Sequence, residues 1–415
     1  MILRLLLLSS ILLELLPGTG RAAESPSPAP PSLLGKVLCG YQGWFNCPGD
    51  GADRGWVHWS RRGSAFGPGT ATVDLWPDVS ELGPTERFAT GFTNAAGQPA
   101  EVFSSFHTDT VQRHFRWMQQ YGIDGIFLQR FAVGLRDPKS LRQNNTVLEH
   151  CRKGAQQTQR ALAVMYDLSE MGSKSLALVR EDWRTLRSQF RVTEDRHYLH
   201  HRGKPLVAVW GIGFNDNRKY SLAECRELVE FLRADGCAVM VGVPTFWREL
   251  KRDALADPAL LDLIRRADVV SPWTVGRYRT LPEVARHAEQ VLKPDLAWCA
   301  EAKVDYLPVV FPGFSWHNLT GGPLNAIPRQ RGEFLWSQFV EAKRAGSQMV
   351  YVAMFDEVDE ATAIFKCTND VPVGEGVQFL SYEGLPSDFY LRVTGAGTRM
   401  IHGTAPLQER LPVSP

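Results

Sequence analysis

The chain has 415 residues, of which 44% are hydrophobic and 22% are charged, and its formal net charge is +1. This length suits one large domain or two ordinary ones, and the composition is that of a globular protein. A net charge so close to zero argues against a protein that binds nucleic acid through bulk positive charge.

The N-terminus has the pattern of a secretory signal peptide. An apolar run, Leu5 to Leu16, follows a basic start, and Gly20 and Ala22 fit a small-residue cleavage site. We therefore expect a signal peptide over residues 1–23, a Pro/Ser-rich spacer over residues 24–34, and a secreted or periplasmic protein. An uncleaved membrane anchor is the alternative. No later segment is long and apolar enough for a membrane span.

The cysteines give no sign of a metal site. There are seven of them, no two form a CxxC pair, and none stands with histidine at zinc spacing. We expect no cofactor and no metal. Cys39 and Cys237 lie in strand-like runs and are expected to be small buried hydrophobic residues rather than bridge partners.

Eight apolar, strand-like runs alternate with helical patterns along residues 35–415. The runs begin at Val37, Gly122, Ala161, Pro205, Ala238, Val269, Tyr306 and Met349. Helices are predicted over Asp109–Tyr121 and Ser221–Gly236, and a closing helix within Leu385–Gly403. Continuous apolar strands followed by helices indicate a parallel sheet buried on both faces, so the sequence predicts an α/β protein with a single (β/α)₈ TIM barrel. A doubly wound open sheet is the alternative, although no GxGxxG follows a strand.

The first predicted unit contains a long loop insertion after its strand. About sixty residues between Phe45 and Asp109 are rich in Gly, Pro, Trp and Asp. Long segments of this kind in a compact domain are usually functional. We expect this insertion to fold over the barrel mouth and to form part of a substrate-binding wall with Trp56, His58, Trp59, Asp74, Trp76 and Asp78.

In a TIM barrel the chemistry lies at the C-terminal ends of the strands. Nearly every predicted strand ends in an aromatic residue with a polar neighbour. These candidates for substrate binding are Tyr41, Gln42, Trp44, Gln129, Arg130, Tyr166, Asp167, Trp210, Trp247, Arg248, Trp273, Trp316, His317 and Asp356. Aromatic platforms with polar groups among them suit a neutral, polyhydroxylated ligand, which indicates a carbohydrate. Packing at the barrel rim is the alternative for each single residue.

The stretch "MFDEVDEATAIFK" gathers four carboxylates between Asp356 and Glu360, directly after the last predicted strand. If that strand ends near Glu357 and the chain then turns helically, the side chains of Glu357 and Glu360 lie on the same side of that turn. Two adjacent carboxylates push their pKa values apart, which glycosidic cleavage uses. An acidic helix N-terminus and a Ca²⁺ or Mg²⁺ site that includes Asp359 are the alternatives.

The two glutamates receive different expected roles. Glu360 lies beyond the strand end, next to an apolar run, where desolvation favours the neutral form of a general acid. Glu357 is expected to stay ionised as the base, held by Tyr, Arg or backbone donors.

Several motifs together resemble the bacterial proteins described as glycoside hydrolase family 71/99-like. They are "GYQGWF", "DLWPDVSE", "GIDGIFLQRF", "PVVFPGFSWHN" and "YVAMFDEVDEATAIFK", and the resemblance extends from Val37 to about Gly403. The related family 99 consists of endo-acting α-mannosidases on a (β/α)₈ barrel with a late Glu-x-x-Glu pair.

The resemblance maps that pair onto Glu357 and Glu360. It implies that the first glutamate deprotonates the sugar 2-hydroxyl, giving an anhydro-sugar intermediate, and that the second protonates the leaving oxygen and later activates water. This chain has Val358 and Asp359 where the family has Trp and His, and Ala361 where glycine follows.

The sequence therefore predicts a monomeric, exported glycoside hydrolase of retaining type that acts on a polysaccharide or glycan. A carbohydrate-binding barrel that has lost catalysis is the alternative.

Overall fold

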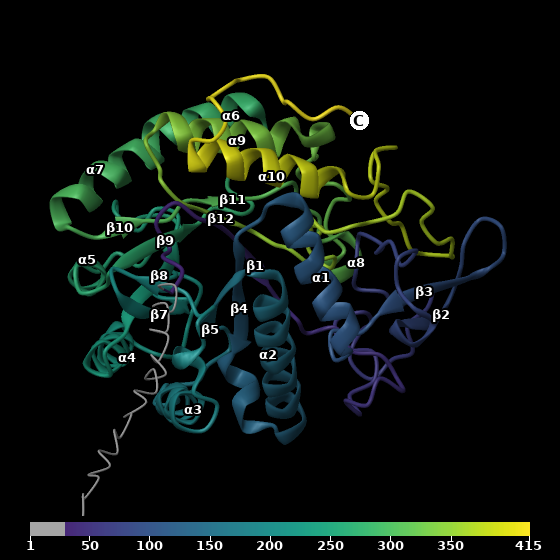
Figure 1. Cartoon of the computed structure of the whole chain (residues 1–415), viewed down its shortest axis with the longest axis horizontal. Helices are drawn as coiled ribbons and strands as arrows, with labels where there is room; N and C mark the ends of the chain where they lie inside the picture. The colour runs from purple at the N-terminus through teal and green to yellow at the C-terminus, as the bar shows by residue number, and fades with distance from the viewer. Residues whose placement is uncertain (1–29) are drawn as a thin grey trace, which may run out of the picture.

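The computed structural model describes residues 30–415, and its centre is a ring of parallel strands enclosed by helices (Figure 1). The strands of the ring are β1 Val37–Tyr41, β4 Gly125–Phe131, β5 Ala161–Asp167, β7 Lys204–Trp210, β8 Ala238–Pro244, β9 Val269–Trp273, β10 Asp305–Tyr306, β11 Val309–Val310 and β12 Val350–Val352. They pair in the order β10-β9-β8-β7-β5-β4-β1-β12-β11. The predicted (β/α)₈ barrel is confirmed, each predicted strand lies in its place, and the open-sheet alternative is excluded.

The seventh strand of the barrel is split into two halves. β10 pairs with β9, whereas β11 pairs with β12. Pro308 stands between the halves, where it has no N–H to donate. The Leu307 N–H donates to the Val270 carbonyl at 2.9 Å, and the Pro308 carbonyl accepts from the Tyr351 N–H at 2.9 Å. The connection therefore reaches both neighbours, and the sheet closes on itself.

Both faces of the strands are buried. Leu38 and Phe127 belong to a core cluster that fills the barrel, whereas their sequence neighbours Val37, Cys39 and Ile126 pack in the cluster between the barrel and the helices. This alternation follows from the two-residue repeat of a strand. It also means that two consecutive residues at a strand end face opposite sides of the sheet.

Ten α-helices surround the strands in residues 30–415. They are α1 Thr108–Tyr121, α2 Pro138–Thr158, α3 Ala177–Ser188, α4 Leu222–Ala234, α5 Ala259–Ile264, α6 Leu281–His287, α7 Lys293–Ala302, α8 His317–Thr320, α9 Glu333–Arg344 and α10 Phe389–His402. In α4 the Ser221 side chain accepts from the Glu224 N–H, and Glu224 bonds back in a capping box. The three helices predicted from sequence are confirmed, including α10 as the closing helix.

The insertion after β1 lies on the C-terminal side of the barrel, as expected. It contains an antiparallel pair, β2 Arg87–Thr93 and β3 Pro99–Phe103, drawn beside α1 and α8 (Figure 1). The N–H groups of Asp74 and Leu75 donate to the Val358 carbonyl at 3.0 and 3.2 Å, which ties the insertion to the chain after β12.

The N-terminal predictions fall mostly outside the described residues. The expected signal peptide lies outside residues 30–415. The expected spacer does not extend to residue 34, because Ser32 already bridges to His200 and Leu33 is fully buried in the core. Between residues 30 and 415 no helix has both the length and the apolar character to cross a membrane.

All seven cysteines are free and buried. The expectation that Cys39 and Cys237 are small buried residues is therefore confirmed.

Candidate active site

A central cavity of about 530 Å³ opens at the C-terminal end of the barrel. Nine of the residues predicted from the strand ends and the acidic stretch line it: Gln42, Trp44, Gln129, Asp167, Trp210, Trp273, Trp316, Glu357 and Glu360. They come from seven different strand ends. The arrangement is the one that a TIM barrel uses to gather chemistry from distant parts of a chain.

The acidic stretch forms a tight loop, not a strand end or a helix. β12 ends at Val352, and residues 358–361 form a turn. The Glu357 carbonyl accepts from the N–H groups of Thr362 and Ala363 at 3.1 and 2.9 Å. The turn still brings Glu357 and Glu360 to one cavity, so the expected outcome holds although β12 is shorter than predicted.

Asp356 is a structural residue of this loop. Its two carboxylate oxygens accept from the backbone N–H groups of Gln42 and Gly43 at 2.8 and 2.9 Å. Complete burial raises its pKa to about 7 in spite of these hydrogen bonds. The bonds link the loop after β12 to the loop after β1, and the side chain does not line the cavity, contrary to the prediction that it binds substrate.

Glu357 is held by two neutral donors. Gln42 Nε2 donates to its Oε1 at 2.6 Å, and Thr362 Oγ1 donates to its Oε2 at 2.8 Å. Burial, and then the charge of Glu360, raise the pKa of Glu357 well above its ordinary value. The expected donors were Tyr, Arg or backbone groups, and side chains of Gln and Thr take their place.

Glu360 shares the same desolvated surroundings. Burial, and then the charge of Asp359, raise its pKa to about 8, while the Trp316 indole lowers it in part. Each glutamate, when charged, disfavours the charge of the other, so the pair retains one proton at neutral pH. The two donors to Glu357 and the Trp316 indole beside Glu360 each favour the ionised form of their glutamate, but burial outweighs them at both residues.

Several buried polar atoms around the cavity lack a partner. Within residues 30–415 nothing bonds to Gln42 Oε1, Gln129 Oε1, Trp44 Nε1 or Trp210 Nε1. Buried polar atoms are nearly always hydrogen-bonded in folded proteins. Two acceptors and two donors around one cavity therefore suit a ligand that both donates and accepts, as a hydroxyl group does.

Aromatic rings supply apolar surface between these polar atoms. Trp210 and Trp273 meet edge to face with ring centroids 5.5 Å apart. Trp316 is 40% exposed at the mouth and packs on Phe314. Such faces can stack on the apolar side of a sugar ring. Asp167 adds a third carboxyl group, and burial raises its pKa to about 6.

Some predicted residues point away from the cavity because neighbours on a strand face opposite sides. Arg130 pairs with Asp182 through Nη2 and Oδ1 at 2.5 Å, and the Tyr166 hydroxyl donates to the same carboxylate at 2.6 Å. Both residues therefore face α3, while Gln129 and Asp167 beside them line the cavity. The Tyr41 hydroxyl lies 2.9 Å from His114 Nδ1, facing α1.

Trp247 and Arg248 also lie outside the cavity. Their Nε1 and Nε atoms donate to Asp295 at 3.1 and 2.8 Å, on the side of α7. Burial raises the pKa of Asp295 to about 7. These contacts hold a helix to the barrel and correct the prediction that both residues bind substrate.

Asp74 and His317 organise a helix start rather than the cavity. Asp74 accepts from the N–H groups of His317 and Asn318 at 2.7 and 2.8 Å, at the beginning of α8. His317 Nδ1 lies 2.8 Å from the Gly322 carbonyl oxygen. The charge of Asp74 thus stabilises the N-terminal end of α8.

Three further residues of the insertion have structural contacts. Trp59 packs against Phe45 with ring centroids 4.4 Å apart, and Trp76 Nε1 donates to the Glu101 carbonyl at 3.0 Å. Asp78 accepts from the Ser80 N–H at 2.9 Å in a local turn. These residues build the insertion and do not reach the cavity, because burying its own aromatic core is what lets the insertion fold.

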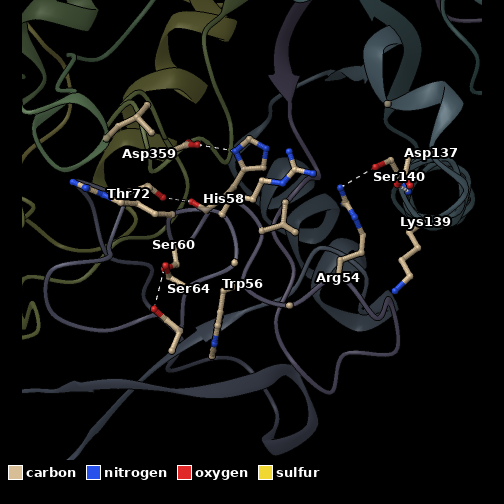
Figure 2. Close-up of a pocket in the computed structure, with 18 of the residues that line it drawn as sticks. Arg54, Trp56, His58, Ser60, Ser64, Thr72, Asp137, Lys139, Ser140 and Asp359 are labelled. Carbon is tan, nitrogen blue, oxygen red and sulfur yellow. Dashed lines mark hydrogen bonds and ion pairs between the residues drawn. The ribbon is translucent and has the colours of Figure 1, made fainter.

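A second, larger hollow lies beside the central cavity. This side cleft measures roughly 1520 Å³ and is lined by residues of the insertion, the start of α2, the end of α8, and Asp359 (Figure 2). His58 lines this cleft rather than the central cavity, and its Nδ1 lies 3.1 Å from Asp359 Oδ2.

Sequence reasoning missed other residues of the central cavity. Phe131, Phe214 and Arg218 line it, and Arg218 lies over the Trp210 ring at 5.1 Å. Phe131 is the last residue of the predicted run "GIDGIFLQRF" and could have been included. Phe214 and Arg218 come from the loop after β7, where no motif distinguishes them.

The carboxylates of the acidic stretch diverge instead of converging on an ion. Asp356 is occupied by backbone donors, and Asp359 faces the side cleft. Among residues 30–415, no three His, Cys, Asp or Glu side chains come together in a group that could hold a metal.

These features define a TIM-barrel protein with a desolvated glutamate pair in an aromatic cavity. The structure is similar to that of the GH99 endo-alpha-mannosidase from Bacteroides thetaiotaomicron, with a TM-score of 0.65 and 15% identity over 90% of this chain and 100% of that one. The complex of that protein with bis-tris-propane gives 0.64 and 14%, with the same coverage. A glycoside hydrolase-like protein gives 0.52 and 14% over 91% of this chain and 97% of that one.

No protein-family model matches the chain, and no curated protein matches it significantly. The structural similarities, at this identity, show that the chain has a fold of the glycoside hydrolase type.

Proposed function

We propose that the protein is a glycoside hydrolase that cleaves a polysaccharide or glycan with Glu357 and Glu360. The observation that carries the proposal is the placement of both glutamates, with raised pKa values, in one cavity of about 530 Å³. The aromatic faces and the unpartnered polar atoms of that cavity suit a sugar. The fold relationship to the GH99 enzyme supports this reaction class.

The proposed reaction follows the retaining route of family 99. Ionised Glu357 takes the proton of the sugar 2-hydroxyl, whose oxygen bonds to the anomeric carbon as the glycosidic bond breaks. Glu360 gives its proton to the leaving oxygen. Glu360 then takes a proton from a water molecule that opens the anhydro-sugar, and Glu357 returns its proton to the sugar oxygen.

The two residues between the glutamates, Val358 and Asp359, make structural contacts in this chain. Val358 is completely buried, and its carbonyl anchors the insertion. Asp359 contacts His58 from that insertion. Because the residues between the glutamates hold the insertion and line the side cleft, the proposal extends to glycosidic cleavage and leaves the sugar open.

The test is an activity screen on α-linked mannans, α-glucans and host-type glycans, with Glu357→Gln and Glu360→Gln as the variants. Both variants should lose at least about 100-fold in kcat/KM on any substrate that the wild type cleaves. Glu375→Gln is the matched control, because Glu375 is exposed and lines neither hollow. Full activity in either catalytic variant would contradict the proposal.

A sugar-binding barrel without catalysis is the second candidate. It is favoured by Asp359, which replaces the family's histidine and adds negative charge next to Glu360. Calorimetric binding of the same glycans without any turnover, unchanged in Glu357→Gln, would support this candidate against the first.

We also propose that the protein is exported after removal of residues 1–23 and acts as a monomer. The support is the apolar run Leu5–Leu16 with its small-residue cleavage site. N-terminal sequencing of the protein from the culture medium or periplasm, and its mass in solution, test these statements. A protein retained in the cytoplasm with Met1 intact would contradict export.

A further inference from the structure

The side cleft adjoins the central cavity through one stacked pair of rings. Trp44 lines the cavity, His58 lines the cleft, and their rings stack with centroids 3.7 Å apart and planes 6° apart. On the other side, Trp316 lines the cavity, and residues 319–321 just beyond it line the cleft. The two hollows therefore border one another at this pair of rings.

The boundary between the two hollows has a fixed ring and, within the described part of the chain, a free acceptor that could bind a ligand. The His58 ring is fixed by its stack on Trp44 and by Asp359, and the Thr72 hydroxyl donates to the His58 carbonyl at 2.8 Å (Figure 2). Asp359 is 3% exposed, and in residues 30–415 its Oδ1 has no hydrogen-bond partner. A buried carboxylate oxygen of this kind accepts a hydroxyl of a sugar that lies across the boundary.

Two other acidic residues of the cleft, Asp53 and Asp137, are exposed and already engaged. Asp53 pairs with Lys139 at 2.6 Å, and Asp137 accepts from the Ser140 N–H at 2.7 Å as the cap of α2. Arg54 is half-buried, and its guanidinium donates to neutral partners, among them Ser140 Oγ at 3.2 Å (Figure 2).

Two neighbouring arginines add exposed positive charge to the cleft. Arg61 and Arg62 are exposed, line the cleft, and form no ion pair with any residue between 30 and 415. A guanidinium presents its donors in a planar fork that matches phosphate, sulfate and carboxylate groups. The same cleft contains Trp56, an aromatic face for a sugar ring, and the Ser60 and Ser64 hydroxyls.

We propose that the side cleft binds the part of the substrate glycan that extends out of the central cavity, and that this part carries an anionic group held by Arg61 and Arg62. The substrate is then an acidic glycan that bears phosphate, sulfate or a uronic-acid carboxylate. This inference rests on the proposed function, because it is the central cavity that makes the ligand a sugar chain.

The experiment measures binding by calorimetry to the Glu360→Gln variant, so that the ligand is not consumed. The probes are a manno-oligosaccharide, its phosphorylated form, its sulfated form, and a matching oligosaccharide that ends in a uronic acid. At least one charged form should bind about 3- to 20-fold more tightly than the neutral form, as two exposed ion pairs allow. The preference should shrink as NaCl is raised from about 0.05 M to about 0.5 M.

Added substitutions locate the effect. Arg61→Ala with Arg62→Ala should remove the preference, and the double Lys replacement should keep part of it. Arg226→Ala is the control, since Arg226 is an exposed arginine on α4 without an ion pair in residues 30–415. Thermal unfolding confirms that each variant folds.

The outcomes separate this inference from the proposed function. Equal affinity for all charged and neutral chains, or a preference that survives the Arg61/Arg62 double alanine replacement, overturns the acidic-glycan inference alone. If no chain binds and the wild type cleaves no glycan, the proposed function fails and this inference fails with it.

Discussion

Replacing Glu360 by glutamine should stabilise the folded protein in a pH-dependent manner. The folded-state pKa of Glu360 is about 8 against an ordinary 4.5, so the folded chain holds this proton more tightly than the unfolded chain. Stability from this group is therefore fully present below about pH 4.5 and is lost as the pH rises towards about 8. Linkage places the loss at pH 7 near 3 kcal/mol, and we take about 2–3 kcal/mol because the side chain is partly open to cavity water.

Glutamine removes this loss because its amide resembles the neutral acid in shape. At pH 7 the free energy of unfolding should rise by about 2–3 kcal/mol, which is about 3–4 °C in Tm for a chain of this size. Near pH 4 the variant and the wild type should coincide. Denaturation curves at pH 4, 5.5, 7 and 8 measure the difference, with Glu375→Gln as a control that changes nothing. A variant that is less stable at pH 7, or a gain that is equal at every pH, would refute the reasoning.

Three further predictions concern the same loop. Thr362→Val removes one hydrogen-bond donor to Glu357, and such a bond to a charged acceptor contributes about 1.5–3 kcal/mol. The acidic limb of the kcat/KM profile against pH should therefore move upward by about 1–2 pH units. The limb should stay in place in Thr394→Val, whose hydroxyl bonds within α10; an unmoved limb in the first variant would exclude Glu357 as the base. Arg329→Met removes the buried donor to the Ala361 and Ala363 carbonyls, and should lower the free energy of unfolding by about 2–4 kcal/mol. Urea denaturation measures the change, and an unchanged midpoint would show that Arg329 does not stabilise the loop. Glu360→Gln should reduce kcat/KM more on a natural glycan than on an aryl glycoside, and Glu357→Gln should reduce both alike; equal losses on the two substrates for Glu360→Gln would contradict its role as the acid.

The barrel was predictable because each of its strands is a continuous apolar run. β5 and β8 are buried along their whole lengths, and runs of that kind followed by helices leave few alternatives. The split of the seventh strand was less visible. Pro308 interrupts its ladder, but proline also occurs at strand ends, so the sequence does not distinguish a break from an end.

Burial of both strand faces also explains why the sequence predicted more substrate-binding residues than the cavity contains. On a strand with one solvent-exposed face, the polarity of a residue shows which face of the sheet its side chain is on. Here both faces are buried and mostly apolar. Gln129 and Arg130 are consecutive and polar, yet one lines the cavity and the other pairs with Asp182. Nothing in their types separates them, because a buried arginine can equally serve a helix contact or a ligand.

The glutamate pair was identifiable from its spacing and its resemblance, whereas its environment was not. The partners of Glu357 are Gln42, from the loop after the first strand, and Thr362, five residues on. The contact between His58 and Asp359 joins residues 301 positions apart. Such pairs depend on the final closure of the barrel, which local patterns do not encode.

The ties between the loops after β1 and β12 have a consequence for synthesis of the protein on the ribosome. Asp356 and Glu357 bond to Gln42 across 314 and 315 positions, so the first strand waits for almost the entire chain before its last neighbour emerges. Closing so long a loop is an entropic cost that comes late in folding. A nascent chain that stops before β12 retains most of the barrel's apolar strands but neither glutamate. The acid pair is therefore created only when the chain is nearly finished.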